Sequence, residues 1–278
     1  MNFNRLIAKL ALFIFLAAIP SAAVYGTAYT IDLTNPSSSV TINGAQFNFD
    51  NISSGSGSYT DMFRVKNTGT ESGYNYDGNS KPIPFDQVGG VGIPHELLGS
   101  LPVVTLNGTQ YMRLNFDANN SAGLTLTDFR MYVNTGGSSV YVTSTANLAN
   151  LGTLVYDFNA GAGGPNTLTI TALPSGSGTD NMSINIPLSV VLGQGFDANT
   201  DNVYFFASFT NTDGGFEEFA TDKSQIVTVG SLIPEAQTVW GGAGMAILGL
   251  VGIISTNRRR RRETASASLE PDAKVLPA

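Results

Sequence analysis

The chain contains no cysteine and a single histidine, His95, and only 13% of its 278 residues are charged. Without cysteine it forms no disulfide and offers neither a thiol nucleophile nor a thiolate metal ligand. A lone histidine argues against zinc sites and against histidine-dependent catalysis. Lysine, glutamate and arginine are too scarce for a helical bundle or a coiled coil. These absences leave a chain that depends on neither disulfides nor charged helices.

Motifs for common catalytic chemistry are also missing. There is no Gly-x-Ser-x-Gly elbow, no phosphate-binding glycine loop, and any Ser-His-Asp triad would have to use His95. A glycosidase needs two carboxylates at a suitable distance, but Glu217 and Glu218 are adjacent, so a strand would point them to opposite faces. We therefore expect a protein that is not an enzyme, with an exported glycoside hydrolase as the weakest alternative.

The residues that are abundant favour strands and turns. The chain has 31 glycines and many Thr, Ser and Asn residues. Residues 110–117 alternate strictly, with Met112, Leu114 and Phe116 on one side, as in a half-buried antiparallel strand. Residues 203–210 are apolar on both sides, which predicts a strand in the middle of a sheet.

The same patterning extends over residues 24–232. In residues 124–133 the alternation slips by one position near Thr127 and Asp128, which predicts a β-bulge. Further strands are expected at residues 63–67, 103–106, 140–143, 153–158, 167–172 and 183–191. Residues 72–100 form one long irregular stretch. We expect an all-β fold, a β-sandwich with jelly-roll-like connections.

The N-terminus has the three zones of a secretory signal peptide. Arg5 and Lys9 give it a positive start, an apolar stretch follows, and Pro20 precedes small residues. The apolar stretch of about ten residues is too short to span a membrane core of about 30 Å. We expect residues 1–23 to form a signal helix for the Sec export machinery, with cleavage after Ala23 or, alternatively, after Ala28.

A second apolar block lies near the C-terminus. Residues 239–256 carry no charge over 18 positions, and as a helix they would be about 27 Å long, enough to cross a membrane. Five arginines follow: Arg258, Arg259, Arg260, Arg261 and Arg262. The positive-inside rule places this end in the cytoplasm and the preceding domain outside. The remaining residues, 263–278, are expected to be disordered.

This C-terminal arrangement resembles the PEP-CTERM sorting signal of exported bacterial proteins. Ile233-Pro234-Glu235-Ala236, the Gly-rich apolar block and the arginines occur in the order of that signal over residues 233–262. The resemblance implies a role for Pro234 and Glu235 in sorting, processing by an exosortase-type protease, and delivery to the cell surface or the exopolysaccharide matrix. Ala236 replaces the second proline, and sixteen residues follow the arginines. The helix is therefore either removed or kept as a membrane anchor.

The middle of the chain also resembles a group of exported PEP-CTERM proteins of unassigned function. This resemblance implies a shared fold and export route, but no reaction. The matching segments cover most of residues 55–220 in the expected order: residues 71–77 (Glu-Ser-Gly-Tyr-Asn-Tyr-Asp), 101–111, 124–129, 176–182 and 213–219 (Asp-Gly-Gly-Phe-Glu-Glu-Phe).

One loop has the spacing of a calcium site. Asp197, Asn199 and Asp201 place oxygen atoms at alternate positions, which suits Ca²⁺ in a tight turn, and a weaker run of the same kind begins at Asp117. Asp and Asn are also ordinary turn residues that bond to their own backbone as Asx-turns. Both interpretations stay open, with Ca²⁺ as the candidate cofactor.

Charge and aromatic residues indicate the partners. Residues 24–235 hold six Lys or Arg against 18 Asp or Glu, and a net charge of −12 would repel nucleic acid. Six tyrosines are candidates for outward or loop positions where rings stack on sugars, although most would serve as cross-strand packing pairs: Tyr59, Tyr74, Tyr76, Tyr111, Tyr132 and Tyr141. We expect a non-catalytic surface or matrix protein with exopolysaccharide as a partner, or alternatively a Ca²⁺-dependent carbohydrate-binding module.

Overall fold

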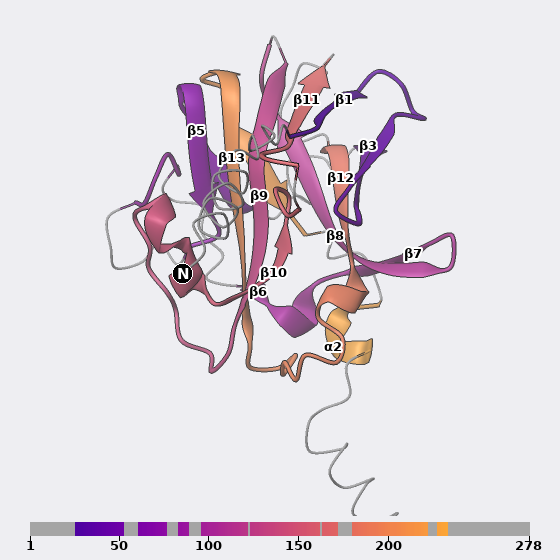
Figure 1. Ribbon diagram of the computed structural model, residues 1–278, viewed down its shortest axis with the longest axis vertical. Coiled ribbons are helices and arrows are strands. Elements are labelled where there is room, and N and C mark those ends of the chain that lie inside the picture. Colours follow the sequence, from indigo (N-terminus) through magenta and orange to yellow (C-terminus); the bar gives the residue numbers. More distant parts are fainter. Residues whose placement is uncertain are drawn as a thin grey trace, which may run out of the picture.

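The computed structural model describes residues 26–52, 61–76, 83–88, 96–121, 123–161, 163–171, 180–221 and 227–232. Within them the chain folds into two seven-stranded sheets, so the predicted all-β sandwich is confirmed (Figure 1). The predicted signal helix, the sorting segment with its arginines, and the tail lie outside the described residues, as do His95 and Tyr59.

Sheet A has a central path of five strands in the order β1-β11-β9-β13-β5, and two short strands extend it. Its strands are β1 (Ala28–Asp32), β5 (Thr68–Tyr74), β6 (Glu96–Leu97), β9 (Leu124–Asn134), β10 (Thr153–Asp157), β11 (Thr167–Thr171) and β13 (Asn202–Asp213). β1 pairs with β11 in parallel, whereas the other pairs of this sheet are antiparallel in the described residues.

Sheet B has the order β2-β3-β12-β8-β14-β4, with a further strand, β7, paired to β8. Its strands are β2 (Ser39–Ile42), β3 (Ala45–Ile52), β4 (Asp61–Val65), β7 (Val103–Leu106), β8 (Thr109–Ala118), β12 (Asp180–Pro187) and β14 (Glu217–Ala220). Asn-Gly turns, with φ of 48° at Asn43 and 50° at Asn107, close its two hairpins β2–β3 and β7–β8. Three 3-10 segments and one short helix complete the elements: η1 (Leu98–Ser100), η2 (Thr145–Leu151), η3 (Leu188–Val190) and α2 (Val229–Leu232).

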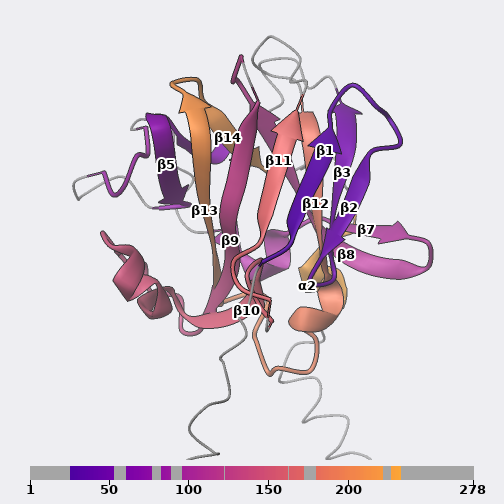
Figure 2. The same ribbon diagram turned by 45° about the horizontal axis from the view of Figure 1, so that its top comes forward.

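The two sheets lie face to face and enclose an aromatic core. Figure 2 shows β5, β13, β9, β11 and β1 of sheet A side by side in one layer. Towards the β4 edge of sheet B, Phe219 of β14 stacks on Phe63 of β4, with ring centroids 4.5 Å apart. Phe116 of β8 stacks across the sandwich on Phe209 of β13 at 5.5 Å. Burial of these rings supplies the main driving force for folding.

Local sequence patterns predicted several strands well. The alternating residues 110–117 form the body of β8, and the doubly apolar residues 203–210 form β13, which lies between β9 and β5. The predicted bulge in β9 is also confirmed. Asp128 pairs with Ser208 and Leu126 with Phe209, so Thr127 is the extra residue.

Two further expectations are wrong in part. Residues 140–143 form no strand but lie in an irregular segment that leads into η2. Residues 72–100 were expected to be irregular throughout, but this stretch includes the end of β5, the two residues of β6, and η1. Residues 140–142 pack on the outer side of sheet A, so there tertiary contacts override the local pattern.

The candidate tyrosines that the structure describes do lie on outward or loop positions, but all except Tyr141 are buried there and are not open to a sugar. Tyr74, Tyr132 and Tyr204 are 0%, 2% and 1% exposed on the outer side of sheet A, in a second core with Leu148 and Leu151 of η2. The same core includes Tyr76, with Tyr141 only partly buried against it, while Tyr111 on sheet B is 7% exposed. Packing is therefore the role of these rings, as the alternative interpretation of the sequence held.

Within the described residues no helix has the length and apolar character needed to cross a membrane. The predicted membrane helix, residues 239–256, lies outside that part of the chain.

Candidate functional site: a buried carboxyl pair

Two glutamates from different sheets meet inside one edge of the sandwich. Glu71 lies on β5, the last strand of sheet A, and is paired with Phe209. Its side chain points to the inward side of the sheet, as the side chain of Phe209 does. Glu217 lies on β14 of sheet B, two residues before the core residue Phe219, so the strand points both side chains inward. The carboxyl groups of Glu71 and Glu217 face each other across the space between the sheets, close enough for one to donate to the other when it carries a proton.

The pair is almost completely removed from solvent. Glu71 is 1% exposed and Glu217 is 0% exposed. Glu71 Oε2 accepts a hydrogen bond of 2.8 Å from the backbone N–H of Asn67. Neither oxygen of Glu217 accepts a hydrogen bond from an N–H or a hydroxyl of the described residues, and the same is true of Glu71 Oε1. Two ionised carboxylates would repel each other here, so the bond between them requires a proton.

Burial sets the protonation of the pair. Burial, and then the carboxyl group of Glu71 beside it, raise the pKa of Glu217 to about 10, because a second negative charge would lie next to the first. Burial also raises the pKa of Glu71, although the hydrogen bonds from Glu217 and from Asn67 act in the opposite direction. At neutral pH the pair therefore holds at least one proton, and the carboxyl group that carries it donates to the other.

The pair has the chemistry of a general acid, but a substrate cannot reach it. Two carboxyl groups with separated pKa values are the catalytic pair of glycosidases. Both groups, however, lie beneath the edge strands at 1% exposure or less, so a sugar ring cannot reach them in this conformation. Glu218 faces the other side of sheet B, where its Oε1 lies 3.4 Å from Arg64 Nη1. The two adjacent glutamates point apart, as expected from strand alternation, and Glu217 pairs instead with Glu71.

The predicted calcium residues lie together in the turn after η3. Asp197 Oδ1 accepts a 2.9 Å hydrogen bond from Asn199 N–H, and Asp201 Oδ2 accepts one of 2.8 Å from Asp197 N–H. These are Asx-type bonds that hold the loop by its own backbone. No group of three or more His, Cys, Asp or Glu that could hold a metal occurs in the part of the chain that the structure describes. Calcium binding by this loop stays a prediction.

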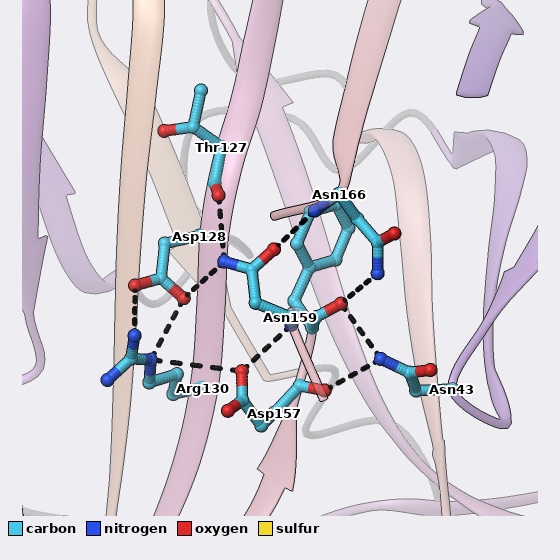
Figure 3. Close-up of polar contacts among 8 residues, drawn as sticks. Asn43, Thr127, Asp128, Arg130, Asp157, Asn159 and Asn166 are labelled. Atoms are coloured by element: carbon cyan, nitrogen blue, oxygen red, sulfur yellow. Dashed lines mark hydrogen bonds and ion pairs between the residues drawn. The ribbon is translucent and has the colours of Figure 1, made fainter. Parts of the chain in front are cut away.

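A third polar cluster ties the two sheets together around the β9 bulge (Figure 3). Arg130 bonds to Asp128 with an Nη2–Oδ2 distance of 2.9 Å, and its Nε lies 3.9 Å from Asp157 Oδ1. Because Thr127 is the extra residue of the bulge, its carbonyl leaves the strand ladder and accepts a 3.0 Å bond from Asn159 Nδ2. Asn43, from the hairpin of sheet B, donates to the carbonyls of Asp157 and Phe158 at 3.0 and 2.9 Å.

The amides of this cluster are used within the protein. Asn159 Oδ1 accepts a 2.7 Å bond from the backbone N–H of Asn166, and Asn166 Nδ2 donates to Phe158 at 2.6 Å. Side chains that are committed in this way are poor ligand-binding groups. The cluster is therefore a structural joint between the bulge of sheet A and a hairpin of sheet B.

Replacing Asn159 by alanine is expected to lower the free energy of unfolding by about 2–3 kcal/mol, because the freed Thr127 carbonyl and Asn166 N–H lose their partner. Urea unfolding followed by circular dichroism measures the change. Asn150→Ala, at an exposed position of η2, is the matched control and is expected to cost within about 0.5 kcal/mol. Equal losses in the two variants would contradict a structural role for the cluster.

Comparison of the chain with protein-family models, with curated proteins and with solved structures finds no match in any of the three.

Sequence reasoning missed Glu71 as a site residue and left Glu217 without a partner. The sequence does contain a signal for Glu217, which is two residues before Phe219 and so lies on the same, inward side of the strand. A carboxyl group buried on that side needs a partner that offsets the cost of its burial. The identity of that group depends on which strand lies across the sandwich, and Glu71 belongs to a strand that the alternation did not predict.

Proposed function

We propose that the protein is a non-catalytic component of the bacterial cell surface or exopolysaccharide matrix. The Sec machinery exports it, and an exosortase-type protease recognises the C-terminal sorting signal. The β-sandwich is the part that acts outside the cell, with connections of the jelly-roll kind that pass from sheet to sheet, as between β8 and β9 or β13 and β14. Its acidic surface suits an extracellular environment and does not suit nucleic acid.

One observation supports this proposal: the elements that the structure describes lie between the two predicted processing signals. β1 begins at Ala28, shortly after the expected cleavage site at Ala23, and α2 ends at Leu232, directly before Ile233-Pro234-Glu235. The end of the domain is anchored, since Val229 is 0% exposed and its N–H donates to Leu101 at 2.9 Å.

Changing the sorting motif is expected to block processing without affecting the fold. In the source bacterium, the full chain with Pro234→Ala and Glu235→Ala should stay in the membrane fraction at a higher mass than the processed wild-type chain. Mass spectrometry of surface and membrane fractions makes the comparison, with Gln237→Ala as a nearby control that should be processed normally. Surface delivery of the double variant with the wild-type mass would contradict the sorting proposal.

A further inference from the structure

We propose that the Glu71–Glu217 pair is a proton-operated latch, which holds β5 against β14 while the two carboxyl groups share one proton and opens this edge of the sandwich when that proton is lost at alkaline pH. The inference is independent of the sorting proposal. It concerns a proton-binding site built into the fold.

The latch lies where the two sheets come together at one edge. β5 ends the central path of sheet A, and β4 and β14 end that of sheet B. The stacked rings of Phe63 and Phe219 lie directly inside this edge. The carboxyl groups of Glu71 and Glu217 meet there and join the two sheets through a shared proton, so loss of that proton leaves two carboxylates that repel each other at the edge of the core.

A short segment, the strap Phe85–Val88, bridges the two edge strands outside the pair. It bonds to β4 and the residue after it through Val88 N–H to Arg64 O at 3.2 Å and Lys66 N–H to Asp86 O at 2.9 Å. It bonds to β5 through Asp86 N–H to Ser72 O at 3.0 Å. A Cβ at Gly73 would lie 2.7 Å from Gln87 Cγ, so the strap packs tightly against β5.

The side chain of Asp86 makes the strap sensitive to the charge of the pair. Its carboxylate accepts bonds from Ser72 N–H at 3.0 Å and from Asn67 Nδ2 at 2.8 Å. Asn67, whose side chain bonds to Asp86, also donates its backbone N–H to the carboxylate of Glu71. The strap and the latch are therefore connected through this one residue. A second negative charge on the pair therefore repels Asp86 and weakens the bonds that hold the strap.

Two further acids of the described residues add repulsion to the pair. Asp213, at the end of β13, acts on both glutamates, and Asp117 of β8 acts on Glu217. The nearby cations are directed elsewhere. Arg64 pairs with Glu218 on the opposite side of sheet B, and Lys66 Nζ lies 4.3 Å from the ring centroid of Phe216.

The direction of the pH effect follows from the raised pKa of Glu217. In the unfolded chain this group titrates at its ordinary value of 4.5, and in the folded chain at about 10. Between these values the folded protein binds more protons, so the contribution of the pair is complete below pH 4.5 and falls as the pH rises towards 10. The proton leaves to solvent, and two carboxylates remain facing each other.

Hydrogen–deuterium exchange of the full chain tests the latch. After correction for intrinsic exchange, protection of the strap amides of Asp86 and Val88 is expected to fall more than tenfold between about pH 7 and about pH 10. In Glu217→Gln the amide donates permanently to Glu71, so strap protection should persist at the higher pH. Glu218→Gln makes the same chemical change on the opposite side of β14 and should keep the wild-type pH dependence.

Three results would overturn the proposal. The first is constant strap protection over this pH range in the wild-type chain, which needs no variant and decides the question even if Glu217→Gln does not fold. The second is an equal loss of protection in wild type and Glu217→Gln. The third is a rise in melting temperature with Ca²⁺ at neutral pH that is present in wild type and absent in Glu217→Gln, because the pair would then bind a cation and not a proton.

Discussion

Replacing Phe219 by alanine is expected to lower the free energy of unfolding by about 3–5 kcal/mol. The ring is 0% exposed and lies at the meeting point of both sheets. It contacts Phe63 and Phe116 of sheet B at centroid distances of 4.5 and 4.9 Å, and Phe129 and Phe209 of sheet A at 6.0 and 6.1 Å. Removing it leaves a cavity that four rings on two rigid sheets cannot fill.

Urea unfolding followed by tyrosine fluorescence measures this loss. Phe216→Ala is the matched control, because Phe216 precedes the same strand but is only partly buried and contacts Arg64 and Lys66 through its ring face. That contact is worth about 0.5–1 kcal/mol at a partly exposed site. If Phe219→Ala and Phe216→Ala lower the free energy of unfolding by the same amount, the close packing of Phe219 between the two sheets would not stabilise the fold as argued.

The sandwich could be predicted because its strands carry their own signal. Residues 110–117 alternate cleanly since β8 has one side on the core and one side turned outward, and residues 203–210 are apolar on both sides since β13 is covered on both faces. The bulge at Thr127 was visible because an extra residue shifts the alternation by one position. Each of these features is local, so the sequence itself records it.

The second core could not be predicted in the same way. Alternation indicates that Tyr132 and Tyr204 point away from the main core, but not whether another segment covers that side. Here the irregular segment after β9 covers it, and the backbone N–H of Val140 and Val142 donate to the hydroxyls of Tyr204 and Tyr74 at 2.9 and 2.8 Å. An outward phase was therefore mistaken for an exposed position.

The carboxyl pair is a long-range feature of the same kind. The sequence places Glu217 beside Glu218 and close to Asp213, which suggests a solvated acidic turn. In the structure these three acids diverge. Asp213 binds Ser121 at the surface, where hydrogen bonds from the hydroxyl and N–H of Ser121 lower its pKa, whereas Glu217 enters the core. The phase of Phe219 marks Glu217 as the inward acid of the strand, but only the three-dimensional arrangement of the two sheets brings Glu71 opposite it.

The turn that delivers Glu217 depends on Gly215, and Gly215→Ala is expected to cost about 3 kcal/mol or more. A Cβ at this position would lie 1.7 Å from the backbone oxygen of Asn119. The clash is between two backbones that are joined by a 2.9 Å bond from Asn119 N–H to Phe216 O, so no side-chain rotation relieves it. Relief requires β14 to move away from β8, which displaces Glu217 from its position opposite Ala118.

Two measurements separate this close approach from an ordinary glycine effect. Gly108 adopts a φ of +81° in the β7–β8 hairpin but has open space around it, so Gly108→Ala should cost only the left-handed strain of about 1–2 kcal/mol. In urea unfolding, Gly215→Ala should therefore lose clearly more stability than Gly108→Ala. It should also lose much of the pH dependence of strap protection, because a displaced Glu217 no longer shares its proton with Glu71. A Gly215→Ala protein that keeps the full pH dependence would show that the latch does not need the β8–β14 register.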